Sequence, residues 1–86
     1  MVHITNVNMV TFLKAIEDRP KQDVLSHELS FSPLFMYEVF KEAKNKRYIK
    51  GGSNTATPSG RTTLYRTYTR DVTIEPKGKA YLENHS

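Results

Sequence analysis

One stretch of this chain, residues 32–50, constrains its fold more than any other. It consists of Ser-Pro-Leu-Phe-Met-Tyr-Glu-Val-Phe-Lys-Glu-Ala-Lys-Asn-Lys-Arg-Tyr-Ile-Lys. The Ser32 hydroxyl can accept a hydrogen bond from the free amides of a first helical turn. Pro33 suits the first helical position, because no amide hydrogen is needed there. The stretch therefore predicts a capped helix that ends near Asn45 and is followed by a short strand over residues 48–50.

The predicted helix has an apolar side and a mixed polar side. At about 100° per residue, the apolar side chains fall together; they are Met36, Val39, Phe40 and Ala43. The opposite side carries Leu34, Tyr37, Glu38, Lys41, Lys44 and Asn45. Lysines on such a face can bind phosphates, and Tyr37 or Asn45 can reach base edges. The same pattern is also typical of a solvated helix with charge pairs, and an exposed Leu34 would allow a protein contact.

Size and composition limit the possible classes of protein. The 86 residues are 37% hydrophobic and 26% charged, which indicates one small folded domain over residues 1–86 and argues against wholesale disorder. No apolar run approaches the roughly 20 residues that span a bilayer, and the first residues do not resemble a secretory signal. The chain has no cysteine, so a disulfide framework and a thiolate metal site are excluded. We expect a cytoplasmic protein with no membrane partner.

The positive charge is concentrated in the second half of the chain. Residues 1–40 hold three Lys/Arg against five Asp/Glu, a net of −2, whereas residues 41–86 hold ten against four, a net of +6. No acidic residue lies between Glu42 and Asp71, and seven basic residues fall in this window: Lys44, Lys46, Arg47, Lys50, Arg61, Arg66 and Arg70. A polyanionic partner would explain the asymmetry. A solvated surface is the alternative.

Further helices are predicted on both sides of this stretch. The first begins at Asn6 or Asn8 and ends near Asp18, because either asparagine can cap it and Pro20 follows. A short second helix is expected over residues 21–28, with Val24 and Leu25 near the interior. The last helix begins at Pro76 and ends near residue 84, and its Ala80, Tyr81 and Leu82 are expected to dock on the first helix. Gly78 in its interior indicates close packing or a later helix start.

The segment between the third and last helices is predicted to form a long hairpin. Residues 51–61 are rich in turn formers and are expected to be a flexible loop. Residues 61–74 are rich in threonine, tyrosine and valine, which favours an extended strand. Apolar and polar side chains alternate imperfectly along this strand. A bulge near Arg70 and Asp71 would let both ends bury apolar side chains, and a turn at Asp71 would instead divide the strand. The order helix, helix, helix, strand, strand, helix is that of a winged helix-turn-helix domain of the α+β class.

Two motifs strengthen this interpretation. The segment Arg47-Tyr-Ile-Lys-Gly51, a polar loop, and then Val72-Thr-Ile-Glu-Pro-Lys-Gly-Lys-Ala-Tyr-Leu-Glu-Asn84 resemble the end of many small winged-helix proteins. The chain most resembles the YjcQ-like family of small phage and prophage winged-helix proteins, over residues 13–84. The chain departs from that family in having Arg47 where glycine is usual and in its longer hairpin. The resemblance implies the fold, and it raises the expectation of a phage or prophage transcriptional regulator.

The predicted interface has two parts. On a winged-helix fold the third helix would enter the major groove, and the hairpin would follow the backbone or minor groove of double-stranded DNA. The recognition-helix candidates are Ser32, Tyr37, Lys41, Lys44 and Asn45, where the Ser32 hydroxyl would donate to a phosphate. The candidates at the helix end and wing are Lys46, Lys50, Arg61, Arg66 and Arg70. Stacking of single-stranded bases on the tyrosines beside Arg66 is a further possibility.

Other classes of function have little support in the sequence. The three histidines lack ligand spacing, so no metal or other cofactor is expected. No nucleophile–base pattern or phosphate-cradling glycine motif is present, so we do not expect an enzyme. The main alternative to DNA binding is a protein-interaction module on the same scaffold, supported by Leu34, Tyr37 and Glu38. Either a homodimer or a monomer is compatible with the sequence.

Overall fold

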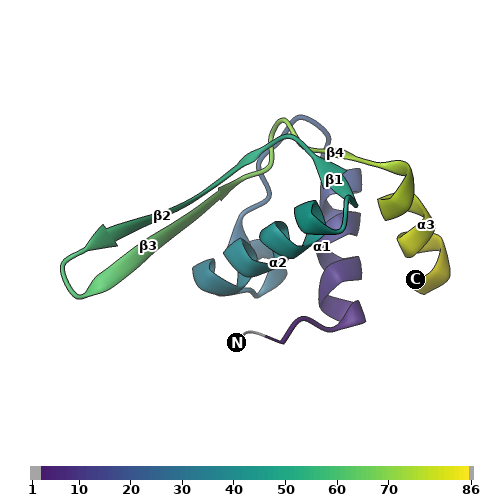
Figure 1. Ribbon diagram of the computed structural model, residues 1–86. Helices are drawn as coiled ribbons and strands as arrows, with labels where there is room; N and C mark the ends of the chain where they lie inside the picture. Colours follow the sequence, from purple (N-terminus) through teal and green to yellow (C-terminus); the bar gives the residue numbers. More distant parts are fainter. Residues whose placement is uncertain (1–2, 86) are drawn as a thin grey trace.

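Three α-helices form the body of the molecule, and a β-hairpin projects from this body as an arm (Figure 1). The computed structural model describes residues 3–85. The helices are α1 (Asn6–Asp18), the 3₁₀ helix η1 (Ser26–Leu29), α2 (Pro33–Asn45) and α3 (Pro76–His85). The strands are β1 (Ile49–Lys50), β2 (Ser53–Ser59), β3 (Thr62–Tyr68) and β4 (Thr73–Ile74). The predicted α+β class is confirmed.

The core lies between α1 and α2. The inner face predicted for α2 is buried, and the α1 side chains Met9, Phe12, Leu13 and Ile16 pack in the same cluster. The rings of Phe12 and Phe40 meet edge to face, with centroids 6.4 Å apart. Val24, Ile49, Val72 and Leu82 extend the cluster beneath the hairpin base and α3. Burial of each large apolar side chain contributes about 1.5–3 kcal/mol, so this cluster fixes the orientation of α2.

α1 begins at Asn6 and ends at Asp18, as predicted, but its capping residue differs from the prediction. Its N-cap is Thr5, not Asn6 or Asn8. The Asn8 amide donates to the Thr5 hydroxyl over 3.2 Å, and the Asn8 side-chain oxygen accepts from the Thr5 amide over 3.2 Å. This reciprocal capping satisfies two backbone donors at once, which explains why Thr5 caps the helix. At α2 the predicted cap is confirmed, because the Ser32 hydroxyl accepts from the Phe35 amide over 3.1 Å.

The second helix predicted over residues 21–28 is largely wrong. Only the four residues of η1 are helical, and Lys21 has a φ of 62°. Polar groups of this segment, one side chain and one backbone amide, bind the base of the hairpin instead. The Asp23 carboxylate accepts from the Thr69 and Arg70 amides over 3.0 and 2.9 Å, and the Val24 amide donates to the Thr69 hydroxyl over 2.7 Å. Val24 is buried, as predicted, but Leu25 is exposed.

The flexible loop predicted at about 51–61 is also wrong over most of its length. Residues 53–59 form β2, which pairs antiparallel with β3 from Ser53 opposite Tyr68 to Ser59 opposite Thr62. The hairpin closes through a two-residue turn, Gly60 and Arg61, in which Gly60 has a φ of 62°. Glycine at the first position of such a turn supplies the positive φ of a type II′ turn. Cross-strand pairing therefore overrides the turn-forming composition of the segment.

A joint divides the hairpin into two ladders. Lys50 pairs with Thr73 and Ser53 pairs with Tyr68, so residues 51–52 of one strand lie opposite residues 69–72 of the other. The Val72 amide donates to the Thr69 carbonyl over 3.1 Å, which closes a turn at the predicted irregularity around Arg70 and Asp71. A Cβ at Gly52 would lie 2.7 Å from the Tyr68 carbonyl oxygen. The joint thus requires glycine on its short side.

The exit of α2 and the docking of α3 complete the body. The Tyr48 amide donates to the Ala43 carbonyl and the Arg47 amide to the Lys44 carbonyl, over 2.9 and 3.1 Å. These two bonds form a Schellman motif, and Arg47 occupies its left-handed position with a φ of 61°. The Gly78 backbone packs closely on the Tyr48 carbonyl, just before β1. The predicted close packing at Gly78 is therefore confirmed.

The side of α3 that meets the body is only partly the one predicted. Leu82 is buried, and the Tyr81 hydroxyl donates to the Asn6 side-chain oxygen over 2.7 Å. Ala80 is exposed, so its predicted docking on α1 is wrong.

Candidate nucleic-acid interface

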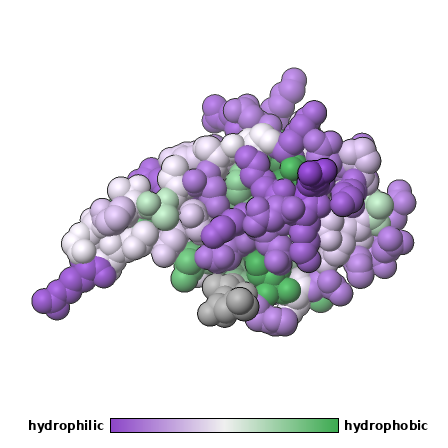
Figure 2. Space-filling view, viewed as in Figure 1, coloured by the Kyte–Doolittle hydropathy of each residue, from purple (hydrophilic) through white to green (hydrophobic). Residues whose placement is uncertain are grey.

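The outer face of α2 is exposed along most of its length. Lys41, Lys44 and Asn45 are exposed, as expected for side chains that would reach a ligand. Ser32 is exposed at the N-terminus of the helix, where its hydroxyl already accepts from the Phe35 amide. Leu34 is exposed beside it. In the space-filling view, the surface of the body is mostly hydrophilic on this face, whereas most of the hairpin surface is near neutral in hydropathy (Figure 2).

Tyr37 differs from the other predicted contacts because the hairpin packs on it. Its ring lies against that of Tyr65 in β3, with centroids 5.1 Å apart. The Asn54 side-chain amide in β2 donates to the Tyr37 carbonyl over 3.0 Å. The Thr67 hydroxyl in turn donates to the Asn54 side-chain oxygen over 2.7 Å. Tyr37 is therefore half-buried and holds the arm on α2.

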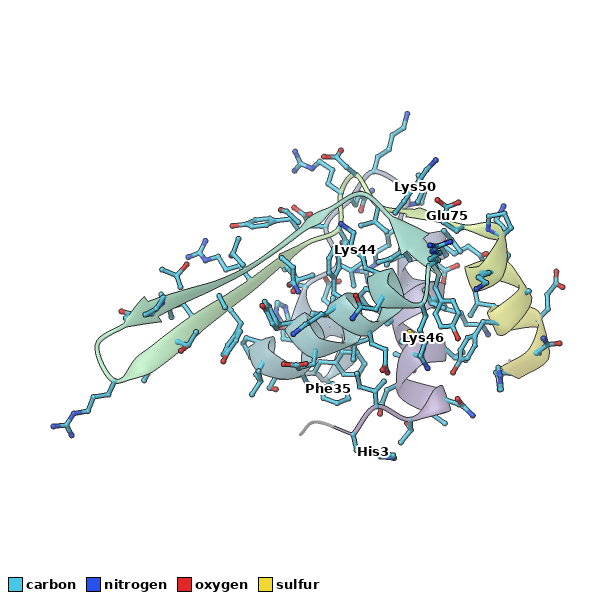
Figure 3. All side chains as sticks on the ribbon, viewed as in Figure 1. His3, Phe35, Lys44, Lys46, Lys50 and Glu75 are labelled. Atoms are coloured by element: carbon cyan, nitrogen blue, oxygen red, sulfur yellow. The ribbon has the colours of Figure 1, made fainter. Side chains whose placement is uncertain are left out.

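Basic side chains gather where α2 ends. An open pocket of about 450 Å³ is lined by Lys44, Arg47, Ile49, Lys50, Glu75, Pro76 and Lys77. Four of these residues are cationic and one is anionic, and they come from α2 and its exit, from β1, and from the start of α3. We name this feature the basic pocket. Figure 3 shows Lys50 and Glu75 close together beyond the end of α2; the Lys50 ammonium lies 4.0 Å from a Glu75 carboxylate oxygen.

Two lysines at the helix end point in different directions. The Lys44 ammonium lies 5.5 Å from the centroid of the Phe40 ring, over its face. Lys46 lies on the other side of the helix end in the view of Figure 3. It lines a separate open pocket with Tyr48, Lys77 and Tyr81. Lys77 thus borders both pockets and continues the positive surface from α2 onto α3.

The three arginines predicted for the wing do not share one surface. Arg61 lies in the turn at the tip of the arm. Arg66 lines a cleft of about 270 Å³ between η1, the start of α2 and β3, together with Leu25 and His27. Arg70 lies in the joint and lines a groove beside α1 with Glu17 and Lys79. The structure therefore separates these arginines from one another and from the basic pocket.

The sequence does not identify Arg47 and Lys77 as members of one site. Arg47 belongs to the acid-free window between Glu42 and Asp71, so the charge pattern was a signal for it. Lys77 lies beyond two acidic residues, and only the fold brings it beside the end of α2.

Most cations of this region lack an acidic partner. Within residues 3–85 the ion pairs are Arg19 with Glu28 and Lys50 with Glu75. Of the seven basic residues between Glu42 and Asp71, only Lys50 therefore has a carboxylate of the described part of the chain within 4.0 Å. In the pocket that Lys46 lines, burial raises the pKa of the Tyr81 hydroxyl, with smaller contributions from Tyr48 and Glu42.

Two further findings bear on possible ligands. Within residues 3–85, His, Asp and Glu side chains do not gather in groups of three or more that would hold a metal ion. In the same part of the chain, each helix is too short or too polar to cross a membrane.

Comparisons with protein-family models, with curated proteins and with solved structures found no match to this chain. The resemblance to the YjcQ-like family therefore depends on the sequence motifs alone.

Proposed function

We propose that this protein is a winged-helix domain that binds double-stranded DNA. The observation that carries the proposal is the acid-free basic window, in which six of seven cations lack a carboxylate of residues 3–85 within ion-pair distance. Unpaired cations attract phosphates, and their neutralisation by DNA releases condensed counterions. The window comprises the end of α2 and the whole arm, which are the elements that a winged helix presents to DNA.

The element order supports the winged-helix assignment. A capped α2 follows η1 through the three residues 30–32, and the arm and α3 come next. The arm is braced on α2 by Asn54 and Tyr65, so the helix and hairpin would approach a duplex as one unit. The motifs shared with the YjcQ-like family favour a phage or prophage regulator. A dimer would match a palindromic operator, and a monomer would contact a single half-site.

The proposed contacts centre on α2 and the tip of the arm. Lys41, Lys44 and Asn45 would face the major groove, Lys50 would bind a phosphate beside it, and Arg61 would reach the flanking backbone. Arg66 and Arg70 lie on other surfaces. We therefore expect them to contribute less than the sequence analysis predicted.

Fluorescence anisotropy with a labelled random duplex tests the proposal. We expect binding at low salt that weakens steeply as salt rises, with a slope near one logarithmic unit per contacted phosphate. The double variant Lys41→Ala/Lys44→Ala should weaken binding about tenfold or more and reduce the slope by about two. Arg66→Ala/Arg70→Ala should have a smaller effect.

The matched control is Lys14→Ala/Lys79→Ala, which removes the same charge from exposed positions on α1 and α3. This control should change affinity less than the α2 pair. Absence of duplex binding by the parent protein at low salt would exclude the proposal. An equal loss for the control pair and the α2 pair would mean that net charge, not the α2 surface, governs binding.

A protein partner is the second candidate, favoured by apolar side chains around the η1 cleft. Leu25 is 49% exposed and Tyr68 is 41% exposed, and both line this cleft. Leu64 is exposed on β3, four residues before Tyr68. Binding to a protein through these side chains would depend little on salt. Leu25→Ser/Leu64→Ser would weaken such binding and leave duplex binding unchanged.

A further inference from the structure

The basic pocket has a feature that a solvated charged surface does not require. Three of its cations lie close together in the chain, at the end of α2 and in β1, and the fold brings Lys77 from the start of α3 beside them. They surround a concave volume of about 450 Å³. Like charges brought together in this way repel one another, so an anion held among them would be stabilised by several cations at once.

The charges within the pocket favour a multiply charged anion. Lys44, Arg47, Lys50 and Lys77 contribute four positive charges, and Glu75 contributes one negative charge. Glu75 is 4.0 Å from Lys50, and within residues 3–85 the other three cations have no carboxylate at ion-pair distance. A guanidinium and three ammonium groups match phosphate oxygens, since arginine binds them with two parallel hydrogen bonds and lysine as a point charge.

Arg47 is also unusual for the backbone position that it occupies at the end of α2. It holds a φ of 61° at the C-terminal position where glycine is the usual residue. A non-glycine residue in this conformation costs about 1–2 kcal/mol. Lys21 and Ser30 hold the same conformation near other helix ends, so the φ value belongs to the helix end and does not itself indicate a ligand. Arg47 lines the basic pocket, and an arginine at this position gives the pocket a guanidinium that glycine would not supply.

We propose that the basic pocket is a phosphate-binding site that takes a ligand with adjacent phosphate groups. Either the backbone of a nucleic acid or a free polyphosphate has this chemistry. Arg47 and Lys77 are the residues that this proposal adds, and they would hold the phosphate oxygens from the two sides of the junction between α2 and α3. The proposal is independent of the proposed function, since a free phosphate ligand needs no duplex.

Isothermal titration calorimetry with tripolyphosphate at low ionic strength tests the proposal. The parent protein should bind one tripolyphosphate. Arg47→Gly and Lys77→Ala should each weaken binding about tenfold, the expected effect of removing one charged hydrogen bond. Glu75→Gln should strengthen binding, because it removes the one carboxylate of the pocket. Lys14→Ala and Lys79→Ala, which remove one charge each elsewhere, should change affinity less than twofold.

The variants separate a binding effect from a folding effect. Arg47→Gly relieves the left-handed strain, so it should fold at least as well as the parent, which circular dichroism would verify. The proposal is overturned if the parent does not bind tripolyphosphate, or if Lys14→Ala and Lys79→Ala weaken binding as much as Arg47→Gly.

The source of the phosphate is decided by repeating the series with a labelled duplex. Loss of duplex affinity in Arg47→Gly, together with displacement of the duplex by tripolyphosphate, would identify the nucleic-acid backbone as the ligand. Tripolyphosphate binding by a protein that does not bind duplex would support the pocket and exclude the proposed function. Duplex binding without tripolyphosphate binding would support the proposed function and overturn the pocket.

Discussion

At the scale of single residues, Arg47 makes a prediction about stability that is separate from any ligand. Its φ is 61°, whereas the preceding residue, Lys46, has a φ of −88°. Arg47→Gly should raise the free energy of unfolding by about 1 kcal/mol, because glycine adopts the left-handed conformation without a steric penalty. Lys46→Gly should lower this free energy by about 0.5–1 kcal/mol, since glycine there only increases the freedom of the unfolded chain. Urea denaturation measures both, and equal changes in the two variants would contradict the explanation.

Tyr81 predicts how stability depends on alkaline pH. Burial raises the pKa of its hydroxyl above 10.0, and this hydroxyl donates to Asn6 over 2.7 Å. The unfolded chain loses this proton near pH 10, before the folded chain does. The contribution of the protonated Tyr81 hydroxyl to the free energy of unfolding is therefore complete below about pH 10. It is lost as pH rises through the higher pKa of the folded state.

Tyr81→Phe should remove this loss, so the free energy of unfolding should fall less steeply above about pH 10 than in the parent. At neutral pH the variant should be less stable by about 0.5–1.5 kcal/mol, the net contribution of one hydrogen bond. Urea denaturation at several pH values measures both effects. Tyr68→Phe, on an exposed ring of β3, is the control for removal of a phenol. An unchanged slope in Tyr81→Phe would contradict the prediction.

At the scale of elements, the joint of the hairpin depends on a side chain that is polar and buried. Thr69 is 2% exposed, and its hydroxyl accepts from the Val24 amide over 2.7 Å. Thr69→Val keeps the shape of the side chain but removes the hydroxyl, which leaves the buried Val24 amide without its acceptor. This variant should therefore lower the free energy of unfolding by about 1–3 kcal/mol. Thr63→Val on the exposed part of β3 should change it by less than about 0.5 kcal/mol. Thermal unfolding of the two variants measures the difference.

The elements that sequence analysis predicted well are those with local causes. The apolar period and the Ser32 cap locate α2, and the period of Met9, Phe12, Leu13 and Ile16 locates α1. β2 was missed because glycine, serine and proline favour turns, and only the pairing with β3 makes this segment a strand. The second helix was overpredicted because Asp23 and Val24 bind the distant Thr69–Arg70 backbone and hydroxyl.

The candidate site was predicted to a similar degree. Charge patterning identified Lys44 and Lys50, which the fold brings together. The same pattern could not tell that Arg66 and Arg70 lie on other surfaces, because the direction of a side chain on a hairpin depends on register and on the joint.

At the scale of the whole molecule, the division into body and arm predicts that stability and the proposed DNA binding can be changed separately. The outer residues of the arm are exposed on both strands and lie outside the core cluster. Deletion of Pro58, Ser59, Thr62 and Thr63 removes two cross-strand pairs. The Gly60–Arg61 turn can then close the shortened hairpin, because removing two pairs keeps the alternation of hydrogen-bonded and non-hydrogen-bonded pairs. This deletion should leave the free energy of unfolding within about 0.5 kcal/mol of the parent.

The same deletion withdraws Arg61 by about 7 Å, the rise of two strand residues. If the tip contacts DNA, duplex affinity should fall about as much as in Arg61→Ala, with a smaller salt slope in both variants. Anisotropy titrations at several salt concentrations measure this. Unchanged affinity in both variants would exclude the tip from the interface.

The contact between Tyr37 and Tyr65 means that intrinsic tyrosine fluorescence can report the position of the arm. The chain contains no tryptophan and five tyrosines, so tyrosine emission is observed without a stronger fluorophore that would absorb its energy. The pair joins α2 to the arm, whereas the second tyrosine pair, Tyr48 and Tyr81, lies within the body. Lifting of the arm from α2 would separate the first pair and leave the second intact. Tyrosine emission of a Tyr48→Phe/Tyr81→Phe background would therefore follow the position of the arm without any attached label.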